Sequence, residues 1–473
     1  MKKGEILTGT VIKTEFPSRG ILYIEDTRVI VKNALEGQTI RFMVSKKRKD
    51  RVEGRLLSVI HPSDRELCVP SCTHFGSCGG CTWQNLPYEE QLSLKKRQVE
   101  AMIEQAGYDF TIEGICGSPI HEGYRNKMEY TFGDEEKGGP LTLGMHKRNS
   151  FYDIVPISQC RIVDPDFNII LKAVLSYFRK KGQTYYHRMR HTGFLRHLVM
   201  RRAVKTGDIL INLVTTSQDI LDEKEFTQAV LSCTPSFIVP GMRENRIPEY
   251  KIDGNITGIL HTINDSLADV VKSDETRILY GQDYLEEYLY NMKFKVTPFS
   301  FFQTNTLSAE VLYGKVREYV GDTKDKVIFD LYSGTGTIAQ VLAPVAKKVT
   351  GVEIVEEAVE AARKNASDNG LSNCEFIAGD VLKVVDELQD KPDIIVVDPP
   401  RDGIHPKALN KIIDFGVKEI VYVSCKPTSL MRDLASFYEA GYEVKRCCLI
   451  DQFPGTVHVE TVVLLSKSGI LIQ

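Results

Sequence analysis

Three cysteines lie within ten residues of one another, at Cys72, Cys78 and Cys81, in the stretch CTHFGSCGGC. Thiols at this density form a disulfide, bind zinc, hold an iron–sulfur cluster or do none of these. The N-terminus shows no signal peptide, and no apolar run approaches the ~18 residues of a membrane-spanning helix. We therefore expect a cytoplasmic protein, in which reduced thiols serve a metal or catalysis.

A different kind of cysteine is Cys425 in EIVYVSCKP, at the end of a predicted strand. A lone cysteine on a strand is typical of a buried core residue. The alternative is a nucleophile, because strand ends of an open α/β sheet border the ligand cleft. A thiolate there can add to carbon 6 of uracil and so activate carbon 5 for methylation, which is covalent catalysis.

This chemistry also needs a base that removes the proton from carbon 5. Glu460, in HVETVVLL, stands at the start of the last predicted strand and is flanked by His458. Without Cys425, the favoured interpretation of Glu460 would be a surface residue on an edge strand. With Cys425, Glu460 is the predicted base.

The stretch DLYSGTGT, from Asp330 to Thr337, ends one predicted strand and opens a helix. Its glycines permit a tight turn and close approach of a ligand. Glu353, at the end of the next strand, can accept hydrogen bonds from a ribose of either NAD or S-adenosylmethionine. Asp380 ends the third strand, where it can meet an adenine amino group. Asp398 opens the turn DPPR after the fourth strand. This turn resembles the one in methyltransferases that act on bases. The alternative interpretation of Asp398 is a residue that caps a loop.

The elements that position these residues fall into consecutive regions. Residues 4–60 show five short alternating strands, which favour a small OB-like barrel that binds RNA. Residues 86–107 have apolar positions at helical spacing and end at a glycine. Residues 120–290 alternate strand-like and helix-like pieces. From about residue 297, strands alternate with helices, which is typical of a doubly wound, mostly parallel α/β sheet.

Two basic stretches are candidate RNA contacts, residues 45–51 (SKKRKDR) and residues 187–202 (HRMRHTGFLRHLVMRR). The alternative for each is a solvated face. The net charge of −3 does not decide between them, because binding to nucleic acid depends on local patches.

Together these motifs resemble the RNA uracil-5-methyltransferases, most closely the 23S rRNA members with an N-terminal TRAM domain and a [4Fe–4S] cluster. The resemblance covers essentially the whole chain and rests on CTHFGSCGGC, YRNK, SFFQTN, DLYSGTGT, DPPR, VSCKP and HVET. It implies that Cys425 is the nucleophile, that Glu460 is the base and that Arg125 contacts RNA. Lys426 is a departure, because the family usually has asparagine there. The implied pocket for S-adenosylmethionine and the target base is lined by Gln303, Tyr332, Thr337, Glu353, Asp380 and Asp398.

The resemblance also implies a [4Fe–4S] cluster held by Cys72, Cys78, Cys81 and Cys160. Zinc accepts four thiolates as well, so the spacing alone does not separate the two. The spacing differs from the C-x3-C-x2-C of radical enzymes, so we expect a structural clamp without a role in methyl transfer. Cys68 is the rival ligand.

The sequence thus predicts a multidomain α/β protein. Residues 1–60 form a TRAM or OB-like barrel, 61–85 and 118–296 a central α+β iron–sulfur domain that binds RNA, and 86–117 and 297–473 a Rossmann-like catalytic domain. The predicted function is methylation of carbon 5 of a uridine in a 23S rRNA hairpin or loop, with S-adenosylmethionine as donor. No obligate protein partner is indicated. One alternative is a tRNA uracil-5-methyltransferase, whose members typically lack the TRAM domain and the cysteine cluster. The other is a redox-responsive RNA-binding protein without turnover.

Overall fold

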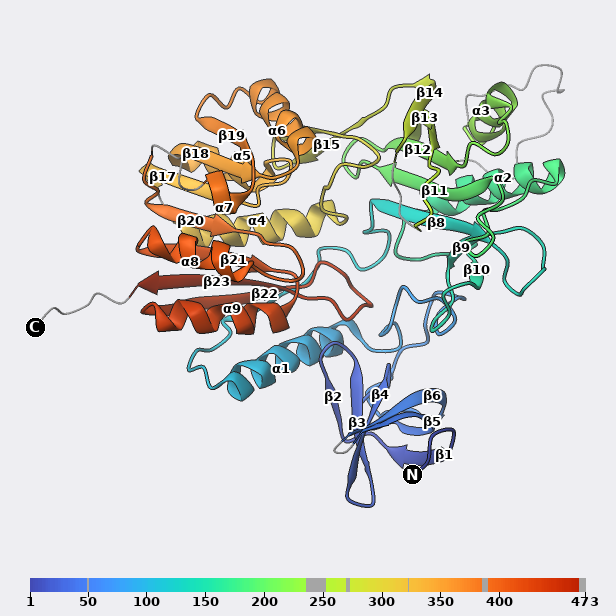
Figure 1. Cartoon of the computed structure of the whole chain (residues 1–473), viewed down its shortest axis with the longest axis horizontal. Coiled ribbons are helices and arrows are strands. Elements are labelled where there is room, and N and C mark those ends of the chain that lie inside the picture. Colours follow the sequence, from blue (N-terminus) through green and yellow to red (C-terminus); the bar gives the residue numbers. More distant parts are fainter. Residues whose placement is uncertain (49–50, 235–251, 269–272, 322, 385–389, 468–473) are drawn as a thin grey trace, which may run out of the picture.

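The computed structural model is built around three large β-sheets, which Figure 1 shows as separate lobes. Lys49 and Asp50, which belong to the basic run 45–51, lie outside the described residues. Among the described residues, no helix combines the length and apolarity needed to cross a membrane. The structure describes residues 1–48, 51–234, 252–268, 273–321, 323–384 and 390–467.

The N-terminal sheet has the strand order β1-β5-β6-β4-β3-β2, and neighbouring strands are antiparallel except β4 and β6. Side chains from several strands, among them Leu22, Val31 and Phe42, share one apolar core. The TRAM assignment of this unit stays a prediction. The strands are β1 (Ile6–Thr10), β2 (Lys13–Glu15), β3 (Arg19–Ile24), β4 (Thr27–Lys32), β5 (Thr39–Arg48) and β6 (Arg51–His61).

The first of the five predicted strands is divided in two. Val11 N donates to the carbonyl of Gln38, and Ile12 N donates to the carbonyl of Ile21, each at 2.8 Å. The chain thus leaves β5 and joins β3 at this point, so β1 and β2 pair with different neighbours.

The central sheet has the order β10-β9-β8-β11-β12-β13-β14, with only β12 and β13 parallel. Helices α2 (Pro165–Lys181) and α3 (Glu223–Leu231) pack on one face, where Phe178 contacts Phe132 and Phe226. The strands are β8 (Lys127–Gly133), β9 (Thr142–His146), β10 (Ile154–Pro156), β11 (Leu195–Arg202), β12 (Asp208–Thr215), β13 (Asn255–Ile263) and β14 (Glu275–Gly281). A hairpin of β15 (Leu285–Leu289) and β16 (Met292–Val296) follows.

The third sheet has the order β19-β18-β17-β20-β21-β23-β22-β7. Its first five strands are parallel, as the sequence predicts for a doubly wound fold. The last predicted strand, β23, is instead antiparallel to β21, because β22 and β23 follow each other without a crossover helix. The strands are β7 (Gly114–Cys116), β17 (Thr323–Leu331), β18 (Ala346–Glu353), β19 (Cys374–Ala378), β20 (Ile394–Val397), β21 (Glu419–Ser424), β22 (Tyr442–Ile450) and β23 (Glu460–Lys467).

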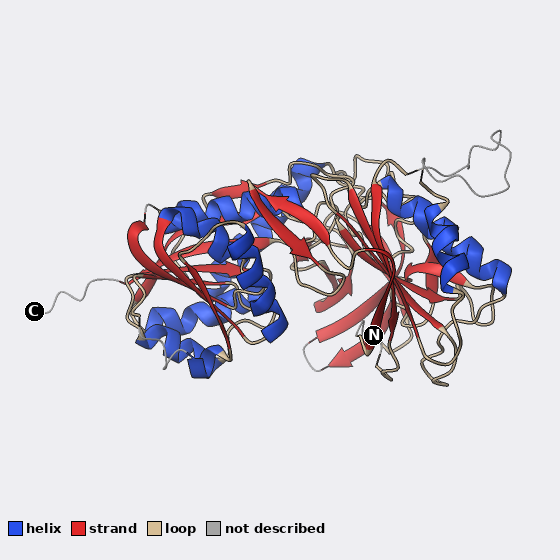
Figure 2. Ribbon diagram, turned by 90° about the horizontal axis from the view of Figure 1, so that it is seen from above, coloured by secondary structure: helices blue, strands red, loops and turns tan. Residues whose placement is uncertain are grey.

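Helices lie on both faces of this sheet, as Figure 2 shows. The predicted helix at 86–107 is confirmed as α1, which ends at Gly107 in the left-handed conformation with φ 74°. α1 packs against α9, and β7 pairs with β22, so both lie with this sheet despite their distance in sequence. The helices are α1 (Tyr88–Ala106), α4 (Thr306–Val320), α5 (Thr337–Leu342), α6 (Glu356–Asp368), α7 (Val381–Val384), α8 (Pro406–Asp414) and α9 (Pro427–Glu439), with a 3₁₀ turn at Ala343–Val345.

The loop between β22 and β23 joins several distant segments. Lys95 of α1 forms a fully buried ion pair with Asp451, with Nζ and Oδ1 2.7 Å apart. Asn305 Nδ2 donates to the carbonyl of Gln452, and Tyr124 OH donates to the carbonyl of Pro454. This loop leads directly into β23 and therefore fixes where that strand begins.

Candidate active site

Five candidate residues follow five parallel strands at one edge of the third sheet. Tyr332 follows β17, Glu353 ends β18, Asp380 follows β19, Asp398 follows β20 and Cys425 follows β21. The order of the strands reverses between β17 and β20, which is where open α/β sheets bind their ligands. The structure thus gathers these predicted residues at one edge.

The glycine-rich loop after β17 is held against the end of β18. Gly334 and Gly336 have φ of 53° and 73°, and a Cβ at Gly336 would lie 2.5 Å from the Phe376 ring. Glu353 Oε2 accepts from Gly334 N and Oε1 from Val355 N, each at 3.0 Å. Glycine is therefore required by both the turn and the packing at this loop.

Asp380 immediately precedes the short helix α7. Its Oδ1 accepts from Leu382 N at 3.0 Å, so the carboxylate caps the helix. The pKa of Tyr332 is raised to about 12 by burial and then by the charges of Asp380 and Asp433. Tyr332 therefore stays protonated and offers a donor beside these carboxylates.

Tyr313 of α4 links several predicted residues. Its buried hydroxyl lies 3.2 Å from Thr337 Oγ1 and also bonds with Gln303. Burial raises the pKa of Tyr313, and the charges of Asp398 and Asp330 raise it further, against those hydrogen bonds. Asp330 Oδ2 accepts from Ala339 N at 2.9 Å, whereas its buried Oδ1 has no partner among the described residues.

The antiparallel pairing of β21 and β23 brings Cys425 and Glu460 together. Ser424 is paired with Thr461, so Cys425, which follows β21, lies next to Glu460, the first residue of β23, and burial and then the charge of Glu460 raise the pKa of Cys425. Glu460 is 6% exposed, whereas Cys425 is half-buried. Glu460 is therefore a buried carboxyl beside the end of β21, unlike the surface residue that its strand position alone suggests.

The ionisable groups around Cys425 and Glu460 shift one another's pKa. Burial, Glu460 and Asp398 raise the pKa of Cys425 to about 11, and Arg401 opposes this shift. Burial and Asp398 raise the pKa of Glu460 to about 8, again against Arg401, and burial raises the pKa of Asp398 to about 7. His458 stays neutral, because burial and then Arg401 lower its pKa to about 4.

The four cysteines predicted as ligands border one small cavity. Cys72, Cys78, Cys81 and Cys160 line a space of about 30 Å³. Burial raises the pKa of Cys81 to about 12 and that of Cys160 to about 11, and neighbouring thiols add to both shifts. The other lining residues are mostly apolar: His74, Phe75, Gly80, Gln84, Met128, Met145, Ile157 and Ile162.

Across the described segments, no group of three or more His, Cys, Asp and Glu side chains is arranged to hold a metal ion. The thiols nevertheless share one cavity, although Cys160 is distant from the other three in sequence. Four thiolates are the number and kind of ligand that both an iron–sulfur cluster and zinc take, but the positions of these thiols do not by themselves form a metal site.

Comparison with known proteins places this geometry in a family. Residues 251–388 match the family model of tRNA (uracil-5-)-methyltransferase, and residues 322–457 match that of a methyltransferase domain. A protein of Clostridium tetani described as an uncharacterized RNA methyltransferase is 47% identical over 100% of both chains. The chain belongs to the RNA uracil-5-methyltransferase family. A Clostridium acetobutylicum protein of the same description is 48% identical over 99% of both chains.

A solved structure extends this likeness to the whole methyltransferase. The crystal structure of Pyrococcus abyssi tRNA (uracil-54, C5)-methyltransferase in complex with S-adenosyl-L-homocysteine has a TM-score of 0.75 and 25% sequence identity. The match covers 97% of this chain and 99% of that chain.

Three residues that the structure places beside the candidates were missed in the sequence. Asp330 and Arg401 lie inside the motifs DLYSGTGT and DPPR, so their neighbours gave a signal for both. Tyr313 lies in the middle of α4, where a buried tyrosine looks like any core residue. Only packing reveals its contacts to Thr337 and Gln303.

The two remaining sequence candidates lie at the rim of the methyltransferase site. Arg125 lies close enough to His458 to lower the pKa of that imidazole, and its Nε donates to the carbonyl of Lys127. Lys426 precedes α9, and its exposed Nζ lies 3.9 Å from Asp402 Oδ1.

Proposed function

We propose that this RNA uracil-5-methyltransferase modifies a uridine of 23S rRNA through a covalent bond between Cys425 Sγ and carbon 6 of the base. The observation that carries the proposal is the pairing of β21 with β23, which sets Glu460 beside Cys425. A thiol beside a buried carboxyl is the pair that the chemistry needs, a nucleophile and a base.

The reaction follows from these two residues. The Cys425 thiolate adds to carbon 6 and creates an enolate, whose carbon 5 takes the methyl group of S-adenosylmethionine and releases S-adenosylhomocysteine. Glu460 then removes the proton from carbon 5, the double bond re-forms and the thiolate leaves. A pKa of about 8 suits Glu460 to this proton transfer near neutral pH.

The methyl donor would be held at the carboxyl edge of the sheet. Glu353 retains lone pairs for ribose hydroxyls beyond its two backbone bonds, and Asp330 keeps an unpartnered buried oxygen there. The other proposed contacts in this pocket for the methyl donor and the target base are Gln303, Tyr332, Thr337, Asp380 and Asp398.

Transfer RNA is the second candidate substrate. The Pyrococcus abyssi enzyme acts on tRNA, yet it matches this chain over nearly its whole length. The expectation that tRNA enzymes lack the extra domains therefore does not exclude tRNA. The cysteine pattern, with four thiols at one cavity, is what favours the 23S rRNA members.

We further propose a [4Fe–4S] cluster on Cys72, Cys78, Cys81 and Cys160. It would clamp the segment near Cys72 to the segment near Cys160 and shape the RNA-binding surface. The cluster supplies no step of methyl transfer. The proposed division is a TRAM barrel at 1–60, a central RNA-binding domain at 61–85 and 118–296, and a catalytic domain at 86–117 and 297–473.

The deciding experiment is nucleoside mass spectrometry of 23S rRNA and tRNA fragments from cells that lack this protein. Loss of a 5-methyluridine from 23S rRNA, with tRNA unchanged, is the expected result. If the 5-methyluridine is lost from tRNA instead, tRNA is the substrate. If neither RNA changes, a redox-responsive RNA-binding protein without turnover becomes the better description.

A further inference from the structure

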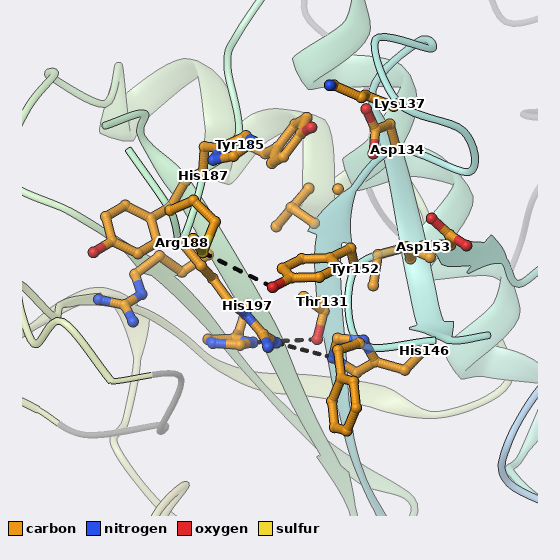
Figure 3. A pocket seen from close by; sticks show the side chains of 17 residues that line it. Thr131, Asp134, Lys137, His146, Tyr152, Asp153, Tyr185, His187, Arg188 and His197 are labelled. Atoms are coloured by element: carbon orange, nitrogen blue, oxygen red, sulfur yellow. Dashed lines mark hydrogen bonds between the residues drawn. The ribbon is translucent and has the colours of Figure 1, made fainter. Parts of the chain in front are cut away.

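A second cavity lies in the central domain, away from the catalytic edge. It has a volume of about 390 Å³ and is bordered by β8, β9, β11 and the segments 151–154 and 185–189. In Figure 3 the segment with Tyr185, His187 and Arg188 faces the strands that carry Thr131 and His146, and Tyr152 lies between them. This volume is in the range of small-ligand sites and suits a single nucleotide.

The basic run 187–202 supplies part of this cavity. His187, Arg188, Arg196 and His197 all line it. Arg196 is only 2% exposed and donates to the carbonyls of Asn264, Ser266 and Ala268, so this run is not simply a solvated face.

The cavity lies on the open face of the central sheet. Met128 and Tyr130 point toward α2, so the alternate residues Lys127 and Thr131 occupy the opposite face. Strand pairing sets His197 beside Thr131 on that face. The face opposite α2 and α3 therefore carries the cavity.

The same face of the sheet reaches the first residues of the proposed catalytic domain. Arg201 is paired with Lys127 at the other end of β8, and its guanidinium donates to the carbonyls of Pro298 and Ser300. Asn126 Nδ2 donates to the carbonyl of Gln303 at 2.9 Å. From Lys127 to Thr131 is four residues, or about 13 Å along the strand. This face of the sheet is therefore continuous from the cavity to the loop that carries Gln303.

The lining combines aromatic rings and neutral polar groups with three cations and two carboxylates: Lys137, Arg188, Arg196, Asp134 and Asp153. Phe151 and Tyr152 are 79% and 61% exposed, so their rings are accessible to a ligand. Arg188 Nη2 lies 3.2 Å from His146 Nε2 and can only donate, so the proton of that neutral imidazole is on Nδ1. His146 Nδ1 is buried without a partner among the described residues.

We propose that this cavity binds one unstacked nucleotide of the substrate RNA, with the base stacked on Tyr152 and the phosphate near Arg188. The inference rests on the proposed function, since it needs an RNA that reaches Cys425. Proteins read single-stranded RNA by stacking its bases on aromatic rings and by contacting its backbone with cations. Binding a second nucleotide here would hold the strand while the target uridine enters the catalytic cleft.

The test measures the affinity of the full-length protein for fluorescein-labelled hexauridylate and hexaadenylate. Tyr152→Ala should weaken the binding of at least one oligonucleotide about tenfold, because base–aromatic stacking is lost. Tyr152→Phe should bind like wild type, since the ring remains. Tyr280→Ala, which removes a 43% exposed tyrosine on β14 outside the cavity, is the matched control and should also bind like wild type.

Unchanged affinity of Tyr152→Ala for both oligonucleotides would overturn the inference. So would unchanged oligonucleotide binding combined with loss of binding to intact ribosomal particles, which would assign the cavity to a protein. These assays need neither methyl donor nor turnover. If wild type fails to methylate RNA while Tyr152→Ala still loses affinity, the proposed function fails and the nucleotide site stands.

Discussion

The proposed role of Glu460 can be tested by trapping the covalent intermediate between protein and RNA. Glu460→Ala should still add its thiol to RNA and transfer the methyl group, but it should not release the product. We expect a covalent protein–RNA band on a denaturing gel with labelled substrate, with turnover reduced at least about 10²-fold, as for lost general bases.

Cys425→Ala is the control for this trap, because it lacks the nucleophile and should give no band. A Cys425→Ala band would show that another residue forms the bond. Normal turnover by Glu460→Ala would show that another group removes the proton from carbon 5.

Arg401 tunes both reacting groups. Burial raises the pKa of Cys425 to about 11 and that of Glu460 to about 8, and Arg401 lowers both. Both groups act in the deprotonated form, so kcat/KM should rise between pH 6 and 9. Arg401→Gln should raise both pKa values, shift the profile to higher pH and reduce the rate at pH 7.5 about tenfold, as one pKa unit implies.

The profile is measured by methyl incorporation at RNA concentrations well below KM across this pH range. Lys407→Gln, an exposed neighbour at the start of α8, should leave it in place. An Arg401→Gln profile that overlays wild type would mean that the guanidinium does not act on these groups.

At the scale of elements, the start of α5 depends on Gly336. Gly336 and Gly370 have similar positive φ, 73° and 69°, but only at Gly336 would an added Cβ lie 2.5 Å from an aromatic ring. Gly370→Ala should cost about 1 kcal/mol from backbone conformation. Gly336→Ala should cost about 1–3 kcal/mol more, from overpacking against Phe376.

Urea unfolding and calorimetric titration with S-adenosylmethionine measure the two consequences. Gly336→Ala should also bind the methyl donor more weakly, whereas Gly370→Ala should bind it normally. Equal losses of stability in the two variants would contradict the packing argument.

At the scale of the molecule, the buried pair of Lys95 and Asp451 ties α1 to the loop before β23. Both side chains are fully buried and 2.7 Å apart. Lys95→Met leaves a buried carboxylate without its cation, which should reduce the free energy of unfolding by about 3–5 kcal/mol. Activity should fall as well, because this loop sets the start of β23 and hence Glu460.

Lys96→Met is the matched control on the same helix, since its partner Glu100 is 3.7 Å away and both are exposed. That variant should lose less than about 1 kcal/mol. Chemical denaturation of both proteins gives the comparison, and equal losses would refute a structural role for the buried pair.

The thiol cavity also joins distant parts of the chain. Protein purified without oxygen should contain iron and acid-labile sulfide in equal amounts, and Cys160→Ser should lose both. Cys68→Ser should keep them, because Cys68 is exposed and is not among the residues that line the cavity. If the protein contains zinc and no iron, the four thiols bind zinc instead of a cluster. If Cys160→Ser keeps its iron and sulfide, Cys160 is not a ligand.

Much of the catalytic half was predictable because its signals are local. Periodic apolar runs mark β17 to β21, and each motif sits at the end of its own strand. Parallel strands place their carboxyl ends at one edge, so Glu353, Asp380, Asp398 and Cys425 had to converge once the fold class was known. Strand β22 and the antiparallel direction of β23 were not predicted, since periodicity does not specify pairing partners.

What the sequence alone determined is therefore the set of candidate residues and the strand ends on which they lie. Only the tertiary structure decided that Glu460 is buried beside Cys425, that Cys160 reaches the cavity of Cys72, and that Tyr152 borders a cavity on the open sheet. The physical reason is that these contacts depend on strand register and on packing between segments far apart in the chain. Local periodicity carries no information about either.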